Sequence, residues 1–250
     1  DGLDINISTN AEAIFGKEKP DVVFHLAGPI NIRKPANDPL FLSDSDFLSR
    51  TEIILDACKK YQVKKLIFVS SGGAIYQDAT MVPTGEEYLA HPTAPYGLAN
   101  LAIENCIKNS GVDFVIARLA NAYGPGQWES GFIPAMIIKV LKKESPIING
   151  SGNQTRDFIY IEDAVEALIV LAGSGKNQIY NVGSGKEISL NDLFALIKNI
   201  LGAKVEPIYK TLTTAETQRS AVDIAKIKQE IGWSPKTYIK EGLLKTIEYY

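Results

Sequence analysis

Short runs of apolar residues, many of them β-branched, recur in the first half of the chain and are separated by polar segments. They occupy residues 21–27, 65–70 and 113–118. Each run is continuous rather than alternating with polar residues, which is typical of strands in a parallel sheet that is covered on both faces. We therefore predict three buried strands at these positions.

Between these runs, apolar residues recur at the three- and four-residue spacing of a helix that buries one face. Strands that alternate with helices of this length are typical of βαβ units. The predicted fold class is therefore α/β, with a doubly wound parallel sheet of the Rossmann type. The two predicted helical stripes consist of Leu48, Thr51, Ile54, Leu55 and Cys58, and of Leu98, Leu101, Ala102 and Cys106.

After Tyr123-Gly124-Pro125-Gly126 the spacing changes and helices become the commoner prediction. One strand is predicted at residues 178–182. Ser189 stands where it can cap a helix, because a serine hydroxyl at that position accepts a free backbone N–H of the first turn. The helices predicted in this part of the chain cover residues 132–142, 163–171, 191–201, 224–231 and 239–249.

The charge and composition argue against several classes of partner. The 250 residues carry a net charge of −3 at pH 7, so there is no basic excess to neutralise nucleic-acid phosphates. The sequence holds neither an apolar run of the ~18 residues that a membrane-spanning helix needs nor a signal-peptide pattern. We therefore expect no nucleic-acid or membrane partner and a cytoplasmic location.

The cysteines and histidines indicate no metal site. Cys58 and Cys106 both lie on apolar helix faces, so we interpret them as small buried residues in a reducing compartment. His25 and His91 have no cysteine close in sequence, which argues against structural zinc.

Polar residues gather where the second predicted strand ends and where a helix begins. Ser70-Ser71-Gly72-Gly73 ends the strand, and Pro95-Tyr96-Gly97-Leu98-Ala99-Asn100 opens the helix. This arrangement resembles the active site of the extended short-chain dehydrogenase/reductase family, particularly its nucleotide-sugar epimerases and dehydratases. The resemblance implies that Tyr96, as tyrosinate, takes a proton from a sugar hydroxyl while hydride passes to NAD. It also implies a serine beside that hydroxyl, and Ser71 is the candidate. Ser70 and Ser71 have the alternative role of bonding local backbone at the strand end.

The chain differs from the family pattern at several positions. The family has a lysine four residues after the tyrosine, on the same helix face, and its charge lowers the tyrosine pKa. Here that residue is Asn100, which we include as the third catalytic-site candidate. The usual hydroxyl position falls on Gly72, one residue from Ser71, and Gln77 stands where the family has glycine. In the preceding helix, Asp46-Phe47 stands where the family has asparagine.

These differences leave two hypotheses open. The first is an NAD-dependent nucleoside-diphosphate-sugar epimerase or dehydratase, similar to UDP-glucose 4-epimerase. The second is a catalytically impaired relative that only binds nucleotide sugar or NAD. A Ser–His–Asp hydrolase is disfavoured, because the sequence has no Gly-x-Ser-x-Gly elbow.

The same resemblance implies which residues contact the cofactor. NAD is expected, and NADP is not excluded. No glycine-rich turn precedes Asp4, although such a turn normally holds the pyrophosphate at a helix N-terminus. We therefore expect an N-terminally truncated chain that lacks the first two strands and binds NAD weakly. The implied cofactor residues are Asp4, Ile5, Leu26, Ala27, Gly28, Ser70, Tyr96 and Asn100.

Two longer strings carry the resemblance on the substrate side. They are Arg118-x-x-Asn121-x-Tyr123-Gly124-Pro125-Gly126 and Gly150-x-Gly152-x-x-x-Arg156-Asp157-Phe158. The resemblance implies that Asn121 and Arg156 contact the diphosphate of a nucleoside-diphosphate sugar, a task that suits the planar guanidinium fork. Glu216 and Arg219 lie where the family has an acid and a second diphosphate arginine. A surface ion pair with Asp157 is the alternative role for Arg156.

The resemblance also divides the chain into domains. It implies a dinucleotide-binding domain of residues 1–122 and 156–185, and a smaller α/β substrate domain of residues 123–155 and 186–250. A homodimer through a helix pair that includes the Tyr96 helix is a further family expectation.

Overall fold

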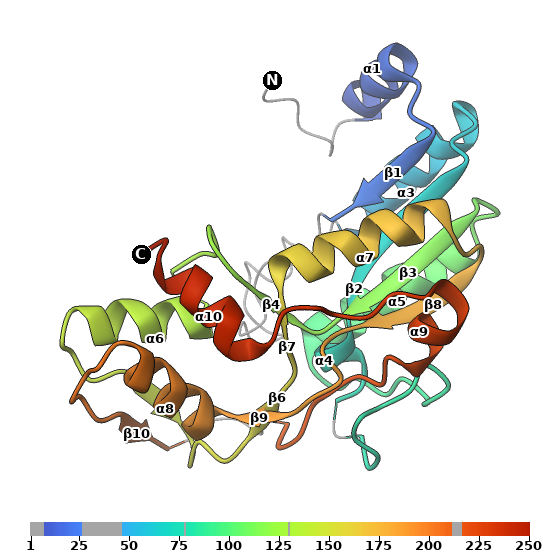
Figure 1. Cartoon of the computed structure of the whole chain (residues 1–250). Coiled ribbons are helices and arrows are strands. Elements are labelled where there is room, and N and C mark those ends of the chain that lie inside the picture. Colours follow the sequence, from blue (N-terminus) through green and yellow to red (C-terminus); the bar gives the residue numbers. More distant parts are fainter. Residues whose placement is uncertain (1–7, 27–46, 78, 130, 212–216) are drawn as a thin grey trace. The chain divides into compact units, whose positions relative to one another are not determined.

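The computed structural model describes residues 8–26, 47–77, 79–129, 131–211 and 217–250. The chain forms two compact units (Figure 1). The first unit comprises Asp1–Gln77, Glu86–Arg118 and Leu168–Tyr180, and the second comprises Asp78–Gly85, Leu119–Ala167 and Asn181–Tyr250. The predicted assignment of cofactor and substrate to separate domains stays a prediction. The candidate residues Asp4, Ile5, Ala27, Gly28 and Glu216, and also Asp46, lie outside the described residues.

The first unit is built on a sheet with the strand order β1-β2-β3-β8 (Figure 1). β1 and β2 run parallel, with Val22 opposite Lys65. The predicted strands are confirmed, and the fold is an α/β Rossmann-like fold as expected. The elements are α1 (Ser8–Glu18), β1 (Val22–His25), α3 (Phe47–Lys60), β2 (Lys65–Ser71), α4 (Gly72–Ile75), α5 (Pro95–Lys108), β3 (Phe114–Leu119) and β8 (Gln178–Val182), of which β3 and β8 continue into the second unit by one and two residues.

Both faces of the sheet are buried at β2. Leu66, Ile67 and Phe68 are consecutive in β2, and each has 0% of its surface exposed. Because successive strand residues point to opposite faces, neither face of β2 meets solvent there. On one face, Leu66 and Phe68 belong to the same hydrophobic cluster as Ile54 of α3 and Ile103 of α5. The continuous apolar runs thus predicted the burial of β2 and β3 correctly. The burial predicted for β1 is wrong in part, because Phe24 is 42% exposed and Val22 and Val23 are only partly buried.

The stripe predicted for α5 is wrong. Leu98 is 51% exposed, and Leu101, Ala102 and Cys106 are only partly buried. The helix instead buries the neighbouring face. That face carries the polar residues Asn100 and Glu104, which have hydrogen-bonding partners inside the unit and can therefore be buried at low cost. The buried residues of α5 are Gly97, Asn100, Ile103, Glu104 and Ile107.

The stripe predicted for α3 is largely confirmed. Thr51, Ile54, Leu55 and Cys58 are buried, whereas Leu48 is 40% exposed and Phe47 is buried in its place. Burial raises the pKa of the Cys58 thiol to about 12, which suits an unreactive core residue.

The described residues of the second unit form three two-stranded sheets and several helices. β4 pairs with β7 in parallel, β5 pairs with β10 in parallel, and β6 pairs with β9 in the antiparallel sense. The predicted cap is confirmed, since Ser189 Oγ accepts the N–H of Asp192 at 3.0 Å at the start of α8. The elements are β4 (Asn121–Tyr123), α6 (Phe132–Leu141), β5 (Ile147–Asn149), β6 (Thr155–Arg156), β7 (Phe158–Tyr160), α7 (Ile161–Gly173, which continues into the first unit), β9 (Ile188–Ser189), α8 (Leu190–Ile200), β10 (Ile208–Lys210), α9 (Ala225–Ile231) and α10 (Ile239–Ile247).

The second unit has a hydrophobic core of its own, in which Met136 and Ile137 of α6, Leu193 and Phe194 of α8 and Leu243 of α10 belong to one cluster. No helix in the described part of the chain has the length and apolar character needed to cross a membrane.

His25, at the end of β1, is a buried titratable group in the core of the first unit. Its Nε2 lies 3.1 Å from Thr51 Oγ1, and that hydroxyl donates to the carbonyl oxygen of Phe47 at 2.8 Å. The hydroxyl proton is thus used, so the imidazole Nε2–H is the donor to Thr51. Burial lowers the pKa of His25 from 6.5 to about 4.

This burial predicts a loss of stability in mild acid. Between pH 6.5 and 4, His25 binds a proton only when the chain unfolds, so the free energy of unfolding falls as the pH falls. We expect the His25 contribution to be about 2 kcal/mol lower at pH 5 than at pH 7. Urea unfolding of the parent and of His25→Asn at both pH values measures the difference. His91→Asn, which changes an exposed histidine, should keep the parent's pH dependence. If the free energy of unfolding of His25→Asn depended on pH as strongly as that of the parent, the loss of stability could not be assigned to His25.

Candidate active site

Tyr96 stands in the first turn of α5, and its side chain meets those of two other candidates. Pro95 begins the helix, where its missing N–H costs nothing and its fixed φ favours the first turn. Burial raises the pKa of Tyr96 above its ordinary value of 10.0, and hydrogen bonds with the side chains of Asn100 and Ser71 lower it in part. The structure therefore brings all three predicted catalytic residues together within the first unit.

Asn100 takes the lysine position of the family but uses part of its amide inside the helix. It is 2% exposed, and its Nδ2 donates to the carbonyl oxygen of Tyr96 at 2.9 Å. Among the described residues, the causes of the Tyr96 pKa shift are burial, Asn100 and Ser71, and none of these is a positive charge. The environment of Tyr96 thus favours the neutral phenol.

Ser70 belongs to a buried polar network that sequence reasoning missed. Its hydroxyl donates to Glu104 Oε1 at 2.7 Å. Arg118 donates to both oxygens of the same carboxylate, from Nε at 3.0 Å and from Nη2 at 2.7 Å. Its Nη1 donates to the Tyr76 hydroxyl at 2.7 Å. Burial by itself would lower the pKa of Arg118, but the hydrogen bonds and charge of Glu104 raise it above its usual value. The sequence signal for this network is an acid eight residues after Tyr96, on the same helix face.

The network separates the surroundings of the two serines. Ser70 is 3% exposed and its hydroxyl is bonded to Glu104, whereas the side chain of Ser71 reaches Tyr96. Contact between Ser70 and a cofactor stays a prediction. Leu26, the remaining described cofactor candidate of the first unit, follows β1 and is 61% exposed.

The second unit brings the described diphosphate candidates close together on short strands. Asn121 in β4 is exposed, and its Nδ2 donates to the carbonyl oxygen of Asp157 at 2.9 Å. Arg156 in β6 donates from Nη1 to the carbonyl oxygens of Thr155, at 2.7 Å, and Thr217, at 2.8 Å. Asn121 thus contacts the backbone of Asp157, the residue that follows Arg156.

Arg219 lies beside the same strands. Its Nε is 3.1 Å from Glu187 Oε1, and its Nη2 is 2.5 Å from Oε2. Glu187 also accepts a short hydrogen bond from the hydroxyl of Thr155, the residue before Arg156. Arg219 pairs with Glu187 in the described structure, and the predicted acid Glu216 lies outside it.

Asp157 is occupied by neighbours other than an arginine. The carboxylate is 1% exposed and accepts the N–H of Ser184 at 2.9 Å, the hydroxyl of Ser184 at 2.6 Å and the N–H of Gly185 at 3.1 Å. The N–H of Val222 is a further donor, at 3.4 Å. Burial raises the Asp157 pKa, and these hydrogen bonds oppose the rise. These contacts argue against the alternative role of Asp157 as a surface ion-pair partner of Arg156.

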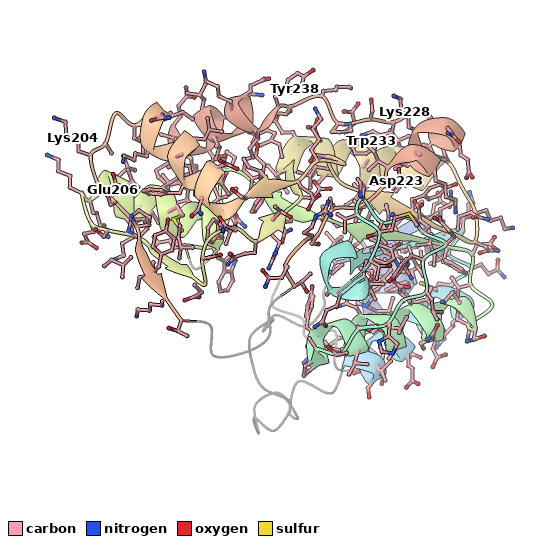
Figure 2. All side chains as sticks on the ribbon, turned by 90° about the horizontal axis from the view of Figure 1, so that it is seen from below. Lys204, Glu206, Asp223, Lys228, Trp233 and Tyr238 are labelled. Carbon is pink, nitrogen blue, oxygen red and sulfur yellow. The ribbon has the colours of Figure 1, made fainter. Side chains whose placement is uncertain are left out.

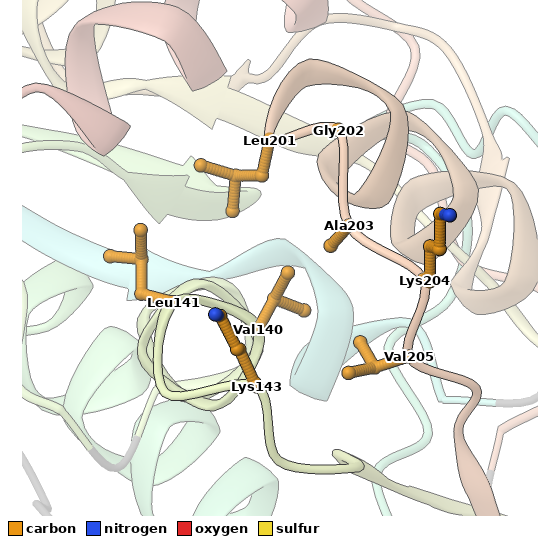
Figure 3. A pocket seen from close by; sticks show the side chains of 8 residues that line it. All are labelled: Val140, Leu141, Lys143, Leu201, Gly202, Ala203, Lys204 and Val205. Carbon is orange, nitrogen blue, oxygen red and sulfur yellow. The ribbon is translucent and has the colours of Figure 1, made fainter.

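Two cavities of the second unit lie elsewhere. One, of about 510 Å³, is lined by eight residues at the ends of α6 and α8, among them Val140, Lys143 and Lys204 (Figure 3). The other has a volume of about 960 Å³, and its lining includes Lys228 and Tyr238 (Figure 2). The described residues that line them do not include Asn121, Arg156 or Arg219. Within the described part of the chain, no three His, Cys, Asp or Glu side chains gather as a metal-binding group.

Comparison with known proteins identifies the family. The sequence pattern of the NAD dependent epimerase/dehydratase family matches residues 2–183. The chain therefore belongs to this family, as the motifs around Tyr96 and Arg156 suggested.

Individual relatives agree with this assignment. The chain is 39% identical over 236 residues to a Methanocaldococcus jannaschii protein provisionally named UDP-glucose 4-epimerase, covering 92% of this chain and 76% of that protein. It is 30% identical over 252 residues to the UDP-glucose 4-epimerase of Mycolicibacterium smegmatis, covering 98% of this chain and 80% of that enzyme. Among solved structures, the Thermotoga maritima UDP-glucose 4-epimerase with UDP-glucose superposes with a TM-score of 0.94 at 33% identity, covering 100% of this chain and 83% of that one.

The turn that Asp157 binds leaves no room for a side chain at Gly183. A Cβ there would lie 2.5 Å from Val222 Cγ2 and 2.6 Å from Asp157 Oδ2. We expect Gly183→Ala to lower the free energy of unfolding by roughly 1–3 kcal/mol, because the turn must move off the carboxylate. Gly173→Ala is the control, since a Cβ at Gly173 has nothing within 4 Å. Urea unfolding compares the two, and equal stabilities would contradict the close packing.

Proposed function

We propose that this chain is an NAD-dependent epimerase of nucleoside-diphosphate sugars, similar to UDP-glucose 4-epimerase. The observation that carries the proposal is the contact between the side chains of Ser71 and Tyr96. Ser71 ends β2, and in open α/β sheets ligands bind beyond the carboxyl ends of the strands. Leu26, which follows the adjacent strand β1, is exposed and offers an apolar surface at that same edge. These residues fit a dinucleotide cofactor, which would accept and return a hydride.

Each residue of the first unit has a role in this proposal. Tyr96 takes the proton of the sugar hydroxyl whose carbon gives up the hydride, and returns it when the carbon is reduced again. Ser71 hydrogen-bonds the same hydroxyl and orients it toward Tyr96. Asn100 has an amide that can contact a ribose hydroxyl but carries no charge to stabilise tyrosinate.

The second unit supplies the donors for a diphosphate. Asn121 is exposed and Arg156 is half-buried, and an amide and a guanidinium are donors suited to a diphosphate. Arg219 would exchange its pairing with Glu187 for a phosphate when the nucleotide sugar binds. A solved relative, the UDP-glucose 4-epimerase of Thermus thermophilus, was crystallised with NAD, and the Thermotoga maritima enzyme was crystallised with UDP-glucose.

A second candidate function is binding of nucleotide sugar or NAD without efficient turnover. Asn100 favours it, because the lysine whose charge would activate the tyrosine is replaced by a neutral amide. Binding without turnover of any nucleotide sugar, at neutral or alkaline pH, would support this candidate over the first.

We also propose a homodimer that covers one face of α5. Leu98 is 51% exposed, and Leu101, Ala102 and Cys106 are only partly buried, so this helix presents an apolar strip on its outer side.

The proposed base predicts an alkaline rate profile. With a pKa above 10, less than about 0.1% of Tyr96 is ionised at pH 7, so the rate should rise with pH. Asn100→Lys should raise kcat on a UDP-sugar at pH 7 by roughly tenfold or more, because the new charge lowers the Tyr96 pKa. Tyr96→Phe should abolish turnover. The measurement is the pH–rate profile of each variant with NAD added.

Asn105→Lys is the matched control for this experiment. Asn105 is exposed on the same helix, so it adds an equal charge away from Tyr96 and should leave the profile unchanged. Brisk turnover of the parent at pH 7, with no gain in Asn100→Lys, would show that position 100 does not limit the base.

The diphosphate donors predict a binding defect. Arg156→Ala should weaken UDP binding by roughly tenfold, because a charge-assisted hydrogen bond contributes about 1.5–3 kcal/mol. Calorimetry with UDP measures the dissociation constant. Lys176→Ala, which removes a surface cation paired with Asp113, should bind like the parent. If Arg156→Ala folds and its dissociation constant is unchanged, Arg156 is not part of the site.

A further inference from the structure

Residues at both ends of the short helix α4 form hydrogen bonds with the beginning of α5 or with the segment just before it. Ser71 precedes α4 and hydrogen-bonds Tyr96. Gln77 follows α4 after one residue, and its Oε1 accepts the N–H of Thr93 at 3.1 Å and the N–H of Ala94 at 3.0 Å. Both ends of α4 thus reach the segment that carries Tyr96.

Gln77 satisfies N–H groups that this segment cannot satisfy by itself. Ala94 is the residue before α5 and has no side-chain oxygen to act as a cap. Pro95 contributes no N–H. The amide oxygen of Gln77 therefore fixes the chain just before the helix, where a free segment would be able to fray.

α4 and α5 are also in direct contact, between the Ser71 hydrogen bond at one end of α4 and the Gln77 hydrogen bonds at the other. A Cβ at Gly97 would lie 2.6 Å from the carbonyl oxygen of Ala74 in α4 and 2.6 Å from Pro92 Cβ. The start of α5 therefore packs against α4 without a gap. If the start of α5 moved away from Gln77, the contact between Tyr96 and Ser71 would therefore change as well.

We propose that Gln77 is a positioning residue, which holds the Tyr96 side chain against Ser71. The inference rests on the proposed function for its consequence in catalysis, whereas the geometry concerns the first unit alone. It gives a role to a position where glycine is usual in the family. The added side chain fixes the segment on which Tyr96 is mounted.

If Gln77 holds Tyr96 against Ser71, the loss of its hydrogen bonds should change the pKa of Tyr96, which the loss of a contact that only stabilises the fold would not do. Ser71, beside α4, and Asn100, on the helix of Tyr96 itself, both lower the pKa of the phenol. In the described part of the chain, the buried charged groups where α5 packs against its neighbours are Glu104 of α5 and Arg118 of β3, which are paired with each other. Loosening the contact with Ser71 should therefore raise the pKa of Tyr96.

The test is a pH titration of Tyr96 in the full chain, with the tyrosine ring carbons labelled with ¹³C and the Tyr96 signal assigned from Tyr96→Phe. Gln77→Met keeps the length of the side chain but removes the acceptor. We expect it to raise the Tyr96 pKa by roughly half a unit, in the direction of Ser71→Ala. In the double variant the pKa should rise no further than in Ser71→Ala, since both changes remove one contact. Gln77→Ala repeats the measurement if the methionine variant does not fold.

The control is Asn109→Ala. Asn109 Nδ2 donates to the carbonyl oxygen of Asn105 at 2.8 Å, so the change removes a hydrogen bond at the far end of the same helix. It should leave the Tyr96 pKa unchanged. An unchanged pKa in both Gln77 variants, or additive shifts in the double variant, would overturn the proposal.

Turnover gives a separate readout. If the proposed function holds, Gln77→Met should lower kcat several-fold and leave KM for the UDP-sugar unchanged, because the base is misplaced while the substrate contacts remain. A rise in KM with unchanged kcat would overturn the catalytic part of the proposal. The titration needs neither NAD nor turnover, so it decides the role of Gln77 even if the proposed function is wrong.

Discussion

The buried ion pair between Glu104 and Arg118 constrains how several elements of the first unit pack. The two side chains are 0% and 4% exposed, so both charges have been removed from water at a large cost. The pair is tolerable because its donors and acceptors are matched: the carboxylate also accepts from Ser70, and the guanidinium also donates to Tyr76. Through these four residues α5, β2, β3 and the end of α4 are fixed relative to one another. Tyr96 lies two turns before Glu104 on the same helix, so its position follows from this contact.

The fold could be predicted where local sequence decides the structure. Continuous apolar runs identified the strands, and the burial of Leu66, Ile67 and Phe68 shows why such runs occur. Ser189 could be assigned as a cap from its position alone, since capping involves only the first turn of the helix it precedes. The grouping of Tyr96, Ser71 and Asn100 was predicted from likeness to a family, and their side chains do meet.

The rest depended on contacts between residues far apart in sequence. The apolar spacing of α5 predicted a buried stripe through Leu98, whereas the helix buries Asn100 and Glu104. A polar residue is buried readily only when it has hydrogen-bonding partners inside the protein. An acid eight residues after Tyr96 does not by itself show that Arg118, in a later strand, pairs with it. The different surroundings of Ser70 and Ser71 also depend on the fold. Adjacent residues in a strand point to opposite faces of the sheet, so the two hydroxyls meet different partners. Periodicity reports how apolar a helix face is, but it does not report which polar groups will be satisfied.

The turn Gly183-Ser184-Gly185 has a consequence for how phosphate contacts are sought in such chains. Consecutive backbone N–H groups in a glycine-rich turn form a concave receptor for anions. In this protein the receptor is filled from within, because the carboxylate of Asp157 accepts the N–H groups of Ser184 and Gly185. An incoming phosphate would have to displace a carboxylate that belongs to the same chain and is therefore present at a high effective concentration. A glycine-rich sequence in a nucleotide-binding family can therefore form an anion site that a carboxylate of the same chain already occupies.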